Sequence, residues 1–272
     1  ETYHKETYER LHPRGPKHDY AYHTEAMDRA MQAGIDDVGL GVLFGLELYR
    51  YEFVGLLMHA EHLEAAYGVG PHTISVPRVK DADDVDASSF SNAISDDIFA
   101  KLVACIRLAV PYTGIIISTR ESQACREKVL PLGVSQISGA SKTSVGGYSG
   151  PEPDDAHTEQ FDISDNRTLD EIILWLMNLG YIPSFCTACY IEGRTGDRFM
   201  SLCKSGQILN CCHPNALMTL KEYLQDYASE ETRRVGEELI QKEIDKVPND
   251  KVRSIAIKNL SDIEAGSRDF RF

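Results

Sequence analysis

The sequence lacks long apolar runs, an excess of positive charge and the common catalytic motifs. No stretch reaches the ~18 consecutive apolar residues that a membrane span needs, and no signal peptide is visible. Lys and Arg number 28 against 42 Asp and Glu, a net charge of −14, which argues against a nucleic-acid or anionic-membrane surface. There is no GxSxG, no Walker loop, no HExxH, and no GxGxxG after the first strand. We therefore expect a cytoplasmic protein without nucleic-acid or membrane partners.

Cysteine is sparse except in one stretch. Five of the seven cysteines fall within the 27 positions from Cys186 to Cys212. The cysteine count is odd, and the chain is long enough to build a hydrophobic core without disulfide bonds. Both features indicate a reducing compartment, with cysteines as metal ligands rather than disulfides. Cys186 and Cys189 form a CxxC pair, which lets two thiolates hold one metal centre from a single turn. Cys212 returns after 22 intervening residues as a third potential ligand.

Spacing alone leaves three interpretations of this stretch open. One is an iron–sulfur cluster on three thiolates, Cys186, Cys189 and Cys212, with one iron lacking a cysteine ligand. Another is a structural zinc that takes its fourth ligand from Cys203, Cys211 or His213. The third is a set of buried free thiols, which the density of cysteines disfavours. A zinc ribbon would normally show a second CxxC, and the Cys211–Cys212 pair is not one.

Strand and helix patterns alternate through residue 140. Apolar and β-branched runs predict strands at 38–43, 73–77, 114–118 and 134–138, after a strand tail at 1–3. Helical spacing predicts helices at 22–33, 48–67, 95–110 and 121–130. Such repeats predict parallel strands joined by right-handed crossovers, in a doubly wound sheet or a (β/α) barrel. A closed eight-stranded barrel would need its first half from elsewhere.

The acidic segment 148–167 is the best domain boundary in the sequence. We predict a partial (β/α) barrel at 1–147, a linker at 148–167 and a mainly helical domain at 168–272. Thr168 is a candidate helix cap, and further helices are expected at 217–227, at 230–246 and in a segment that runs to about residue 265. The fold class predicted is thus α/β, followed by helices that carry the cysteine stretch.

Polar residues follow the predicted strands. Active sites of parallel α/β folds lie at the carboxyl ends of the strands. The guanidinium of Arg120 suits a carboxylate, and Ser138 and Ser141 offer short donors. This set indicates a pocket for a small zwitterion or carboxylate. The alternative is structural, with Arg120 paired to Glu121 at a helix start. The residues expected at the carboxyl ends of the predicted strands are Glu1, the turn 41–45, Arg78, the run 118–121 and the run 138–143.

Several segments together resemble one family. They are ETYHKETYERLHPRGPKHDY, DRAMQAGIDDVGLGVLFGL, GPHTISVPR, ISTRE, LGVSQISGASKTSVGGY and CTACYIEGRTGDRFM. The chain is similar, along essentially its whole length, to the HydG family of FeFe-hydrogenase maturases, which are radical S-adenosylmethionine (SAM) tyrosine lyases. The earlier segments also resemble 2-iminoacetate synthase of thiamine biosynthesis, the alternative within the enzyme class. The CTAC segment and the returning cysteine favour the maturases.

The resemblance implies a radical-SAM (β/α) TIM-type barrel followed by a helical C-terminal domain. It implies cleavage of tyrosine to p-cresol and dehydroglycine, which breaks down to carbon monoxide and cyanide assembled on iron for the H-cluster. The implied cofactors are SAM, a 4Fe-4S radical cluster and an auxiliary 4Fe-4S cluster with an additional iron. The implied partners are tyrosine, FeFe-hydrogenase and the other maturases. A hypothesis from another class is a non-catalytic scaffold that binds metal at the CxxC…C site.

The resemblance also assigns residues by motif. Arg120 would bind the tyrosine carboxylate with Ser138 and Ser141 beside it. The auxiliary cluster would be held by Cys186, Cys189 and Cys212. The additional iron would take a histidine, for which we predict His72, with His62 as the alternative. The residues expected near SAM are Glu1, Gly39, Gly41, Pro77 and Arg78.

The sequence departs from the family in one respect. The radical cluster of the family needs a CxxxCxxC loop after the first strand, and this sequence has none. The two cysteines outside the main stretch, Cys105 and Cys125, lie in predicted helices. We therefore expect the second half of the barrel plus the C-terminal domain, which needs the missing N-terminal half as a partner and does not cleave SAM alone.

Overall fold

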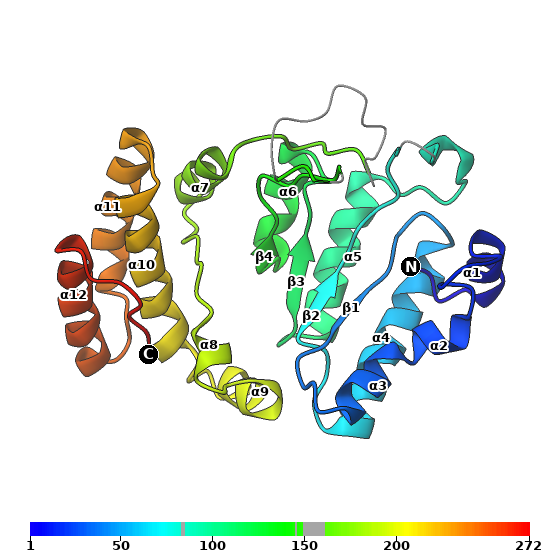
Figure 1. The fold of residues 1–272 in the computed structure, drawn as a ribbon, viewed down its shortest axis with the longest axis horizontal. Helices are drawn as coiled ribbons and strands as arrows, with labels where there is room; N and C mark the ends of the chain where they lie inside the picture. Colours follow the sequence, from blue (N-terminus) through cyan, green and yellow to red (C-terminus); the bar gives the residue numbers. More distant parts are fainter. Residues whose placement is uncertain (83–84, 145, 149–160) are drawn as a thin grey trace. The chain divides into compact units, whose positions relative to one another are not determined.

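The computed structural model describes residues 1–82, 85–144, 146–148 and 161–272. They form two compact units, Glu1–Asn166 and Arg167–Phe272. The first unit alternates strands and helices (Figure 1). Its elements are α1 Lys5–Leu11, α2 Tyr20–Thr24, α3 Ala26–Gln32, β1 Gly39–Gly41, α4 Tyr49–Tyr67, β2 Thr73–Ser75, α5 Asp96–Ala109, β3 Gly114–Ile117, α6 Gln123–Val129 and β4 Gln136–Ile137, with 3-10 turns at Ala87–Ser89 and Leu130–Leu132.

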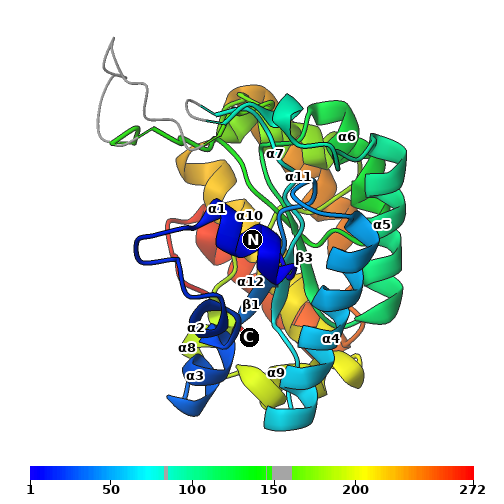
Figure 2. The ribbon, with the colours of Figure 1, turned by 90° about the vertical axis from the view of Figure 1, so that its right-hand side faces the viewer.

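The strands form one parallel sheet in the order β1-β2-β3-β4. Leu40, Ile74 and Ile115 stand side by side in this register and are nearly fully buried. Because side chains alternate along a strand, these residues share one face of the sheet. They pack in one core with apolar residues of the helices that follow the strands, and Figure 2 shows α4 and α5 alongside the sheet. The predicted α/β class with a parallel sheet is therefore confirmed.

Two elements near the start of the chain differ from the prediction. Residues 1–3 are not a strand, although the Glu1 carbonyl accepts a hydrogen bond from the Leu43 amide at 2.7 Å. The helix expected at 22–33 is broken at Glu25 into α2 and α3, because Glu25 has a non-helical backbone (φ −87°, ψ 9°). The Asp19 side chain caps α2 by accepting from the Tyr22 amide.

The second unit is helical. The long helices α10, α11 and α12 pack together, and α7 packs on α11, around buried leucines such as Leu217, Leu220 and Leu224. The Thr168 side chain caps α7 as one half of a reciprocal capping box with Glu171. Helix α10 begins eight residues earlier than predicted and contains Pro214. The elements are α7 Leu169–Asn178, α8 Ala188–Ile191, α9 Gly196–Lys204, α10 Leu209–Asp226, α11 Glu230–Ile244 and α12 Asp250–Glu264.

The predicted linker has two parts. Residues 149–160 lie outside the described residues, while 161–166 belong to the first unit. Among the helices that are described, none is both long enough and apolar enough to cross a membrane.

Candidate functional site

A short segment at 161–165 lies across the carboxyl ends of three strands. The amides of Ser164 and Asp165 both donate to the carbonyl of Thr119, which follows β3, at 3.0 and 3.2 Å. The Asp162 amide donates at 2.9 Å to the carbonyl of Asp81, in the chain after β2. On the far side, the Thr143 hydroxyl donates to the Phe161 carbonyl at 3.1 Å. The segment thus brings the residues after β2, β3 and β4 into one region.

Arg120 lies in this region, and the neighbouring Glu121 carboxylate favours its charged form. Its guanidinium carbon lies 3.7 Å from the centre of the Phe161 ring. Among the described residues the guanidinium makes no hydrogen bond or ion pair, and desolvation lowers its pKa. A half-buried guanidinium of this kind is suited to a ligand carboxylate. Ser138 and Ser141 are half-buried, and the Ser138 amide donates to the Ile117 carbonyl at 3.0 Å, which extends the sheet toward this region.

Arg126 also contacts the 161–165 segment. Its guanidinium is fully buried and donates to the Asp165 carboxylate and to the Ser138 carbonyl. A buried ion pair is held in place because each partner would be left uncompensated without the other. Arg126 therefore ties the 161–165 segment to the end of β4. The sequence analysis missed this pair and Phe161, because nothing local in the sequence links positions so far apart.

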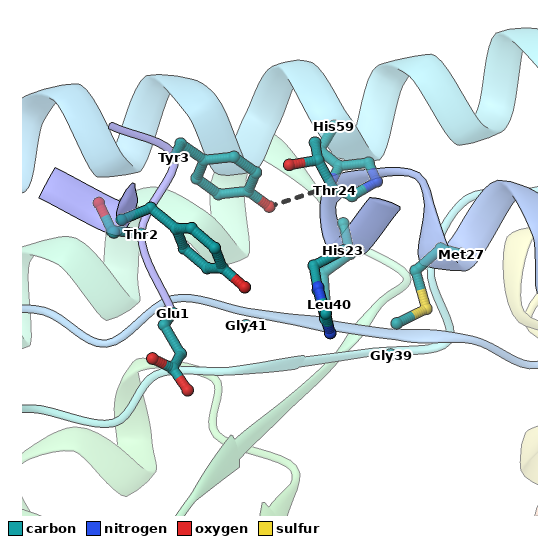
Figure 3. Close-up of a pocket in the computed structure, with 11 residues that line it drawn as sticks. Glu1, Thr2, Tyr3, His23, Thr24, Met27, Gly39, Leu40, Gly41 and His59 are labelled. Carbon is teal, nitrogen blue, oxygen red and sulfur yellow. Dashed lines mark hydrogen bonds between the residues drawn. The ribbon is translucent and has the colours of Figure 1, made fainter. Parts of the chain in front are cut away.

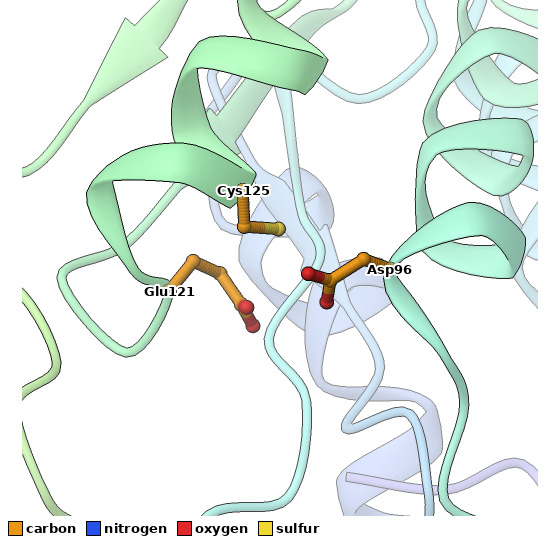
Figure 4. Close-up of side chains that lie close together, drawn as sticks. All are labelled: Asp96, Glu121 and Cys125. Atoms are coloured by element: carbon orange, nitrogen blue, oxygen red, sulfur yellow. The ribbon is translucent and has the colours of Figure 1, made fainter.

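Arg78 is placed differently from Arg120. It is buried, its Nε donates to the Glu121 carboxylate at 3.0 Å, and its Nη2 lies 2.8 Å from Asp96. Although desolvation opposes its charge, Glu121 raises the pKa of Arg78. Glu121 and Asp96 also lie close to the Cys125 thiol (Figure 4), whose pKa is raised to about 12 by burial and by Glu121. Glu121 and Asp96 are already paired with the Arg78 guanidinium, so the three side chains form an ion-pair network. At a SAM site, Arg78 would therefore support neighbouring residues and would not contact the cofactor itself.

Three of the residues expected near SAM line a cavity of about 160 Å³ between β1 and α4. They are Glu1, Gly39 and Gly41, and Figure 3 shows them below the side chains of Tyr3 and His59. The Tyr3 hydroxyl lies 3.1 Å from His59 Nδ1. Although desolvation opposes it, hydrogen bonds from Lys17 and His12 lower the pKa of Glu1 to about 2. Pro77 is outside the lining, and its carbonyl accepts from the Phe44 amide at 2.9 Å.

The two candidate histidines lie in different places within the first unit. His72 comes just before β2, at the end of the strand opposite to Arg78, and its Nδ1 is 3.5 Å from Asp37. His62 is on α4, with Nε2 2.6 Å from Asp28, and it lines a second cavity. Both therefore face a carboxylate in the protein, and both stay predictions as iron ligands.

The cysteine stretch folds so that its thiols are neighbours. Cys186 and Cys189 lie just before and within α8, Cys203 lies on α9, and Cys211 and Cys212 lie in the first turn of α10. All are free thiols. The pKa of the Cys212 thiol is raised to about 12, first by desolvation and then by the other four cysteines of the stretch. Thiolates that oppose one another's ionisation in this way need a cation to coexist, which a bound metal would supply.

The closest grouping of potential ligand atoms lies outside the cysteine stretch. Among the described residues, the only group of three or more His, Cys, Asp or Glu ligand atoms that all lie within 4.8 Å of one another is Asp96, Glu121 and Cys125. A tetrahedral zinc, at about 2.3 Å from each thiolate, would bring its sulfurs to about 4 Å from one another. Among the described residues, no three cysteine sulfurs meet this limit together, so the metal-free stretch does not present three sulfurs already at zinc spacing. By their chemistry, these thiols fit either an iron–sulfur cluster or a zinc ion.

Comparison with known proteins gives related matches. Residues 75–182 match the family model described as the Biotin and Thiamin Synthesis associated domain. The chain is 32% identical over 184 residues to 2-iminoacetate synthase of Escherichia coli (strain K12) and 31% identical to that of Salmonella typhimurium. Each alignment covers 67% of this chain and 48% of the relative, so the chain spans about half the length of the curated relatives it matches.

Two solved structures match nearly the whole chain. A crystal structure of HydG, described as a maturase of the [FeFe]-hydrogenase, is 55% identical with a TM-score of 0.95, over 100% of this chain and 59% of that one. The HydG of Carboxydothermus hydrogenoformans is 39% identical with a TM-score of 0.77, over 96% of this chain and 56% of that one. The predicted resemblance is confirmed: in sequence and fold, the whole of this chain is similar to part of the FeFe-hydrogenase maturase HydG.

Proposed function

We propose that the chain is part of a radical SAM tyrosine lyase that serves FeFe-hydrogenase maturation. The observation that carries this proposal is the match to HydG along the whole chain, including the cysteine stretch. The curated 2-iminoacetate synthases match over only 67% of the chain. The chemistry of both sites supports the proposal, because a free guanidinium suits an amino-acid carboxylate and three thiolates suit a cluster with one open iron.

The residues divide the proposed work as follows. Arg120, stacked on Phe161, binds and orients the tyrosine carboxylate, with Ser138 and Ser141 beside it. The cavity at Glu1, Gly39 and Gly41 contributes to the SAM site, with Pro77 and Arg78 supporting it. Cys186, Cys189 and Cys212 hold the auxiliary 4Fe-4S cluster, and His72 or His62 ligates the additional iron. The cluster, when bound, supplies an open iron to which small ligands such as carbon monoxide and cyanide bind.

The radical step needs parts that these 272 residues do not include. SAM cleavage requires a second 4Fe-4S cluster on a CxxxCxxC loop, and no such loop occurs in the sequence. We propose that this part comes from the first half of the barrel and that the chain alone is inactive. The partners proposed for the whole protein are tyrosine, FeFe-hydrogenase and the other maturases, in the cytoplasm.

The test is a product analysis of the longer protein that contains this chain. Under anaerobic conditions with reductant, SAM and tyrosine, we expect p-cresol together with carbon monoxide and cyanide. Replacement of Cys212 by alanine should spare p-cresol and abolish most of the carbon monoxide. Formation of p-cresol without carbon monoxide or cyanide by the unaltered protein would instead support a 2-iminoacetate synthase. Zinc without acid-labile sulfide would support a metal-binding scaffold.

A further inference from the structure

The last residues of the chain run back along α10 toward the cysteines (Figure 1). Arg268 Nε lies 2.9 Å from the Asp226 carboxylate, and the Asp269 amide donates to Glu222 at 2.9 Å. The Phe272 amide then donates to the Asn215 side chain at 2.9 Å. The partners on α10 are four and seven residues apart, so they share one face of the helix. One turn further along the same face are Cys211 and Cys212.

Phe272 is held firmly at the end of this path. The Asn215 carboxamide accepts from the Phe272 amide and also lies 3.5 Å from the Phe272 carbonyl oxygen, as a donor. Asn215 is only 2% exposed, and the Phe272 side chain packs against the core of the second unit. A buried carboxamide that lost these partners would be left unsatisfied, so the contact is stable.

Phe272 also contacts the other part of the cysteine stretch. The Arg194 guanidinium donates to the Phe272 carbonyl oxygen. The Arg194 amide donates to the Cys189 carbonyl at 2.8 Å, and Arg194 Nη1 lies 3.7 Å from Cys211 Sγ. Next to it, Arg271 Nε lies 2.9 Å from Glu192. One residue, Phe272, therefore joins the loop after the CxxC pair to the helix that carries Cys212.

We propose that Arg194, Asn215 and Phe272 form a clasp that sets the spacing between the CxxC pair and Cys212. Arg194 and Asn215 are positioning residues, since they act on the thiols through Phe272 and the Cys189 carbonyl. The proposal rests on the proposed function, because the spacing matters only if Cys186, Cys189 and Cys212 bind one metal centre together. The first two sulfurs come from the CxxC segment and the third from α10. The clasp fixes these elements before metal arrives, which lowers the entropy lost when the site is filled.

Trivalent arsenicals test the spacing in the metal-free 272-residue chain. Phenylarsine oxide binds two thiols and reports on the CxxC pair alone, whereas arsenite binds three and also needs Cys212. Cys203 and Cys211 are first replaced by serine, so that neither can serve as the third thiol. In this background we expect Arg194→Met to weaken arsenite binding at least tenfold and to leave phenylarsine oxide binding unchanged. Removal of Arg271 and Phe272 should act in the same way, although it substitutes no residue of α8 or α10.

Arg234→Gln is the matched control, because it breaks an exposed ion pair with Glu238 on α11, and it should change neither affinity. Unchanged arsenite binding in the clasp variants overturns the proposal. A parallel loss of phenylarsine oxide binding overturns it too, since the CxxC pair itself would then be disturbed, as does loss of the helical fold in both variants. Absence of iron and sulfide from the unaltered, reconstituted protein would contradict the proposed function and leave the arsenite result intact.

Discussion

The strand-end region and the cysteine stretch differ in how far the protein satisfies its own polar groups. At the strand ends, Arg78 and Arg126 are buried against carboxylates, whereas Arg120 makes no hydrogen bond or ion pair with a described residue. In the cysteine stretch, burial and the four other thiols both oppose ionisation of the Cys212 thiol. The polar groups of the first region are therefore mostly paired within the protein, whereas the thiols of the second region would be neutralised by the proposed metal.

The largest expected effect separates ligand cysteines from their neighbours. Cys212→Ser should remove most of the iron and sulfide from the reconstituted protein, because the CxxC pair then offers only two thiolates. Cys203→Ser should keep both at the level of the unaltered protein. Anaerobic iron and sulfide analysis measures this difference. Equal losses in the two variants would mean that Cys203 is a ligand as well.

The second prediction tests how much the buried ion pair of Arg126 and Asp165 contributes to stability. Arg126→Met should lower the free energy of unfolding by about 3–5 kcal/mol, because it leaves the Asp165 carboxylate buried and uncompensated. Adding Asp165→Leu should recover much of the loss. Urea unfolding followed by circular dichroism measures both changes.

Lys128→Met is the control for this measurement, since it removes the exposed pair with Asp97. It should leave the unfolding midpoint unchanged, because exposed pairs contribute little. A similar loss in both variants would show that burial of the pair is not what matters.

The smallest effect concerns the Arg120 guanidinium. In the longer protein with a whole barrel, Arg120→Gln should weaken tyrosine binding about ten- to a hundredfold, since a hydrogen bond to a charged group contributes about 1.5–3 kcal/mol. Tyramine, which has no carboxylate, should bind both proteins equally. Calorimetric titration measures both affinities. An equal loss for tyramine would mean that Arg120 supports the pocket without touching the carboxylate.

The sequence allowed the sheet to be predicted because its signals are local. β-Branched runs such as 114–117 alternate between core and opposite face, and Ser95 caps α5 as expected. The grouping of the cysteines was also predictable, since CxxC spacing is set by a single turn. The segment 161–165 was not, because backbone hydrogen bonds to Thr119 hold it, and such bonds do not depend on side-chain identity.

The start of α10 was mispredicted for a related reason. A proline is usually a sign that a helix ends, yet Pro214 lies inside α10. The turn before Pro214 is nevertheless formed, since the amides of Cys211 and Cys212 donate to the Ile208 carbonyl at 3.0 and 2.8 Å. The contact of Arg194 with Phe272 links positions 78 residues apart, and no pattern in the sequence connects them.

Pro214 has a consequence for how the cysteine end of α10 responds to strain. Proline has no amide hydrogen, so the Asn210 carbonyl four residues earlier lacks its usual donor within the helix. The turn with Cys211 and Cys212 is thus joined to the rest of α10 by one hydrogen bond fewer than an ordinary turn. This first turn can therefore move more easily, relative to the rest of α10, than the first turn of an uninterrupted helix. If Cys212 binds the proposed cluster, a small adjustment of its position would disturb fewer helical hydrogen bonds than in an uninterrupted helix.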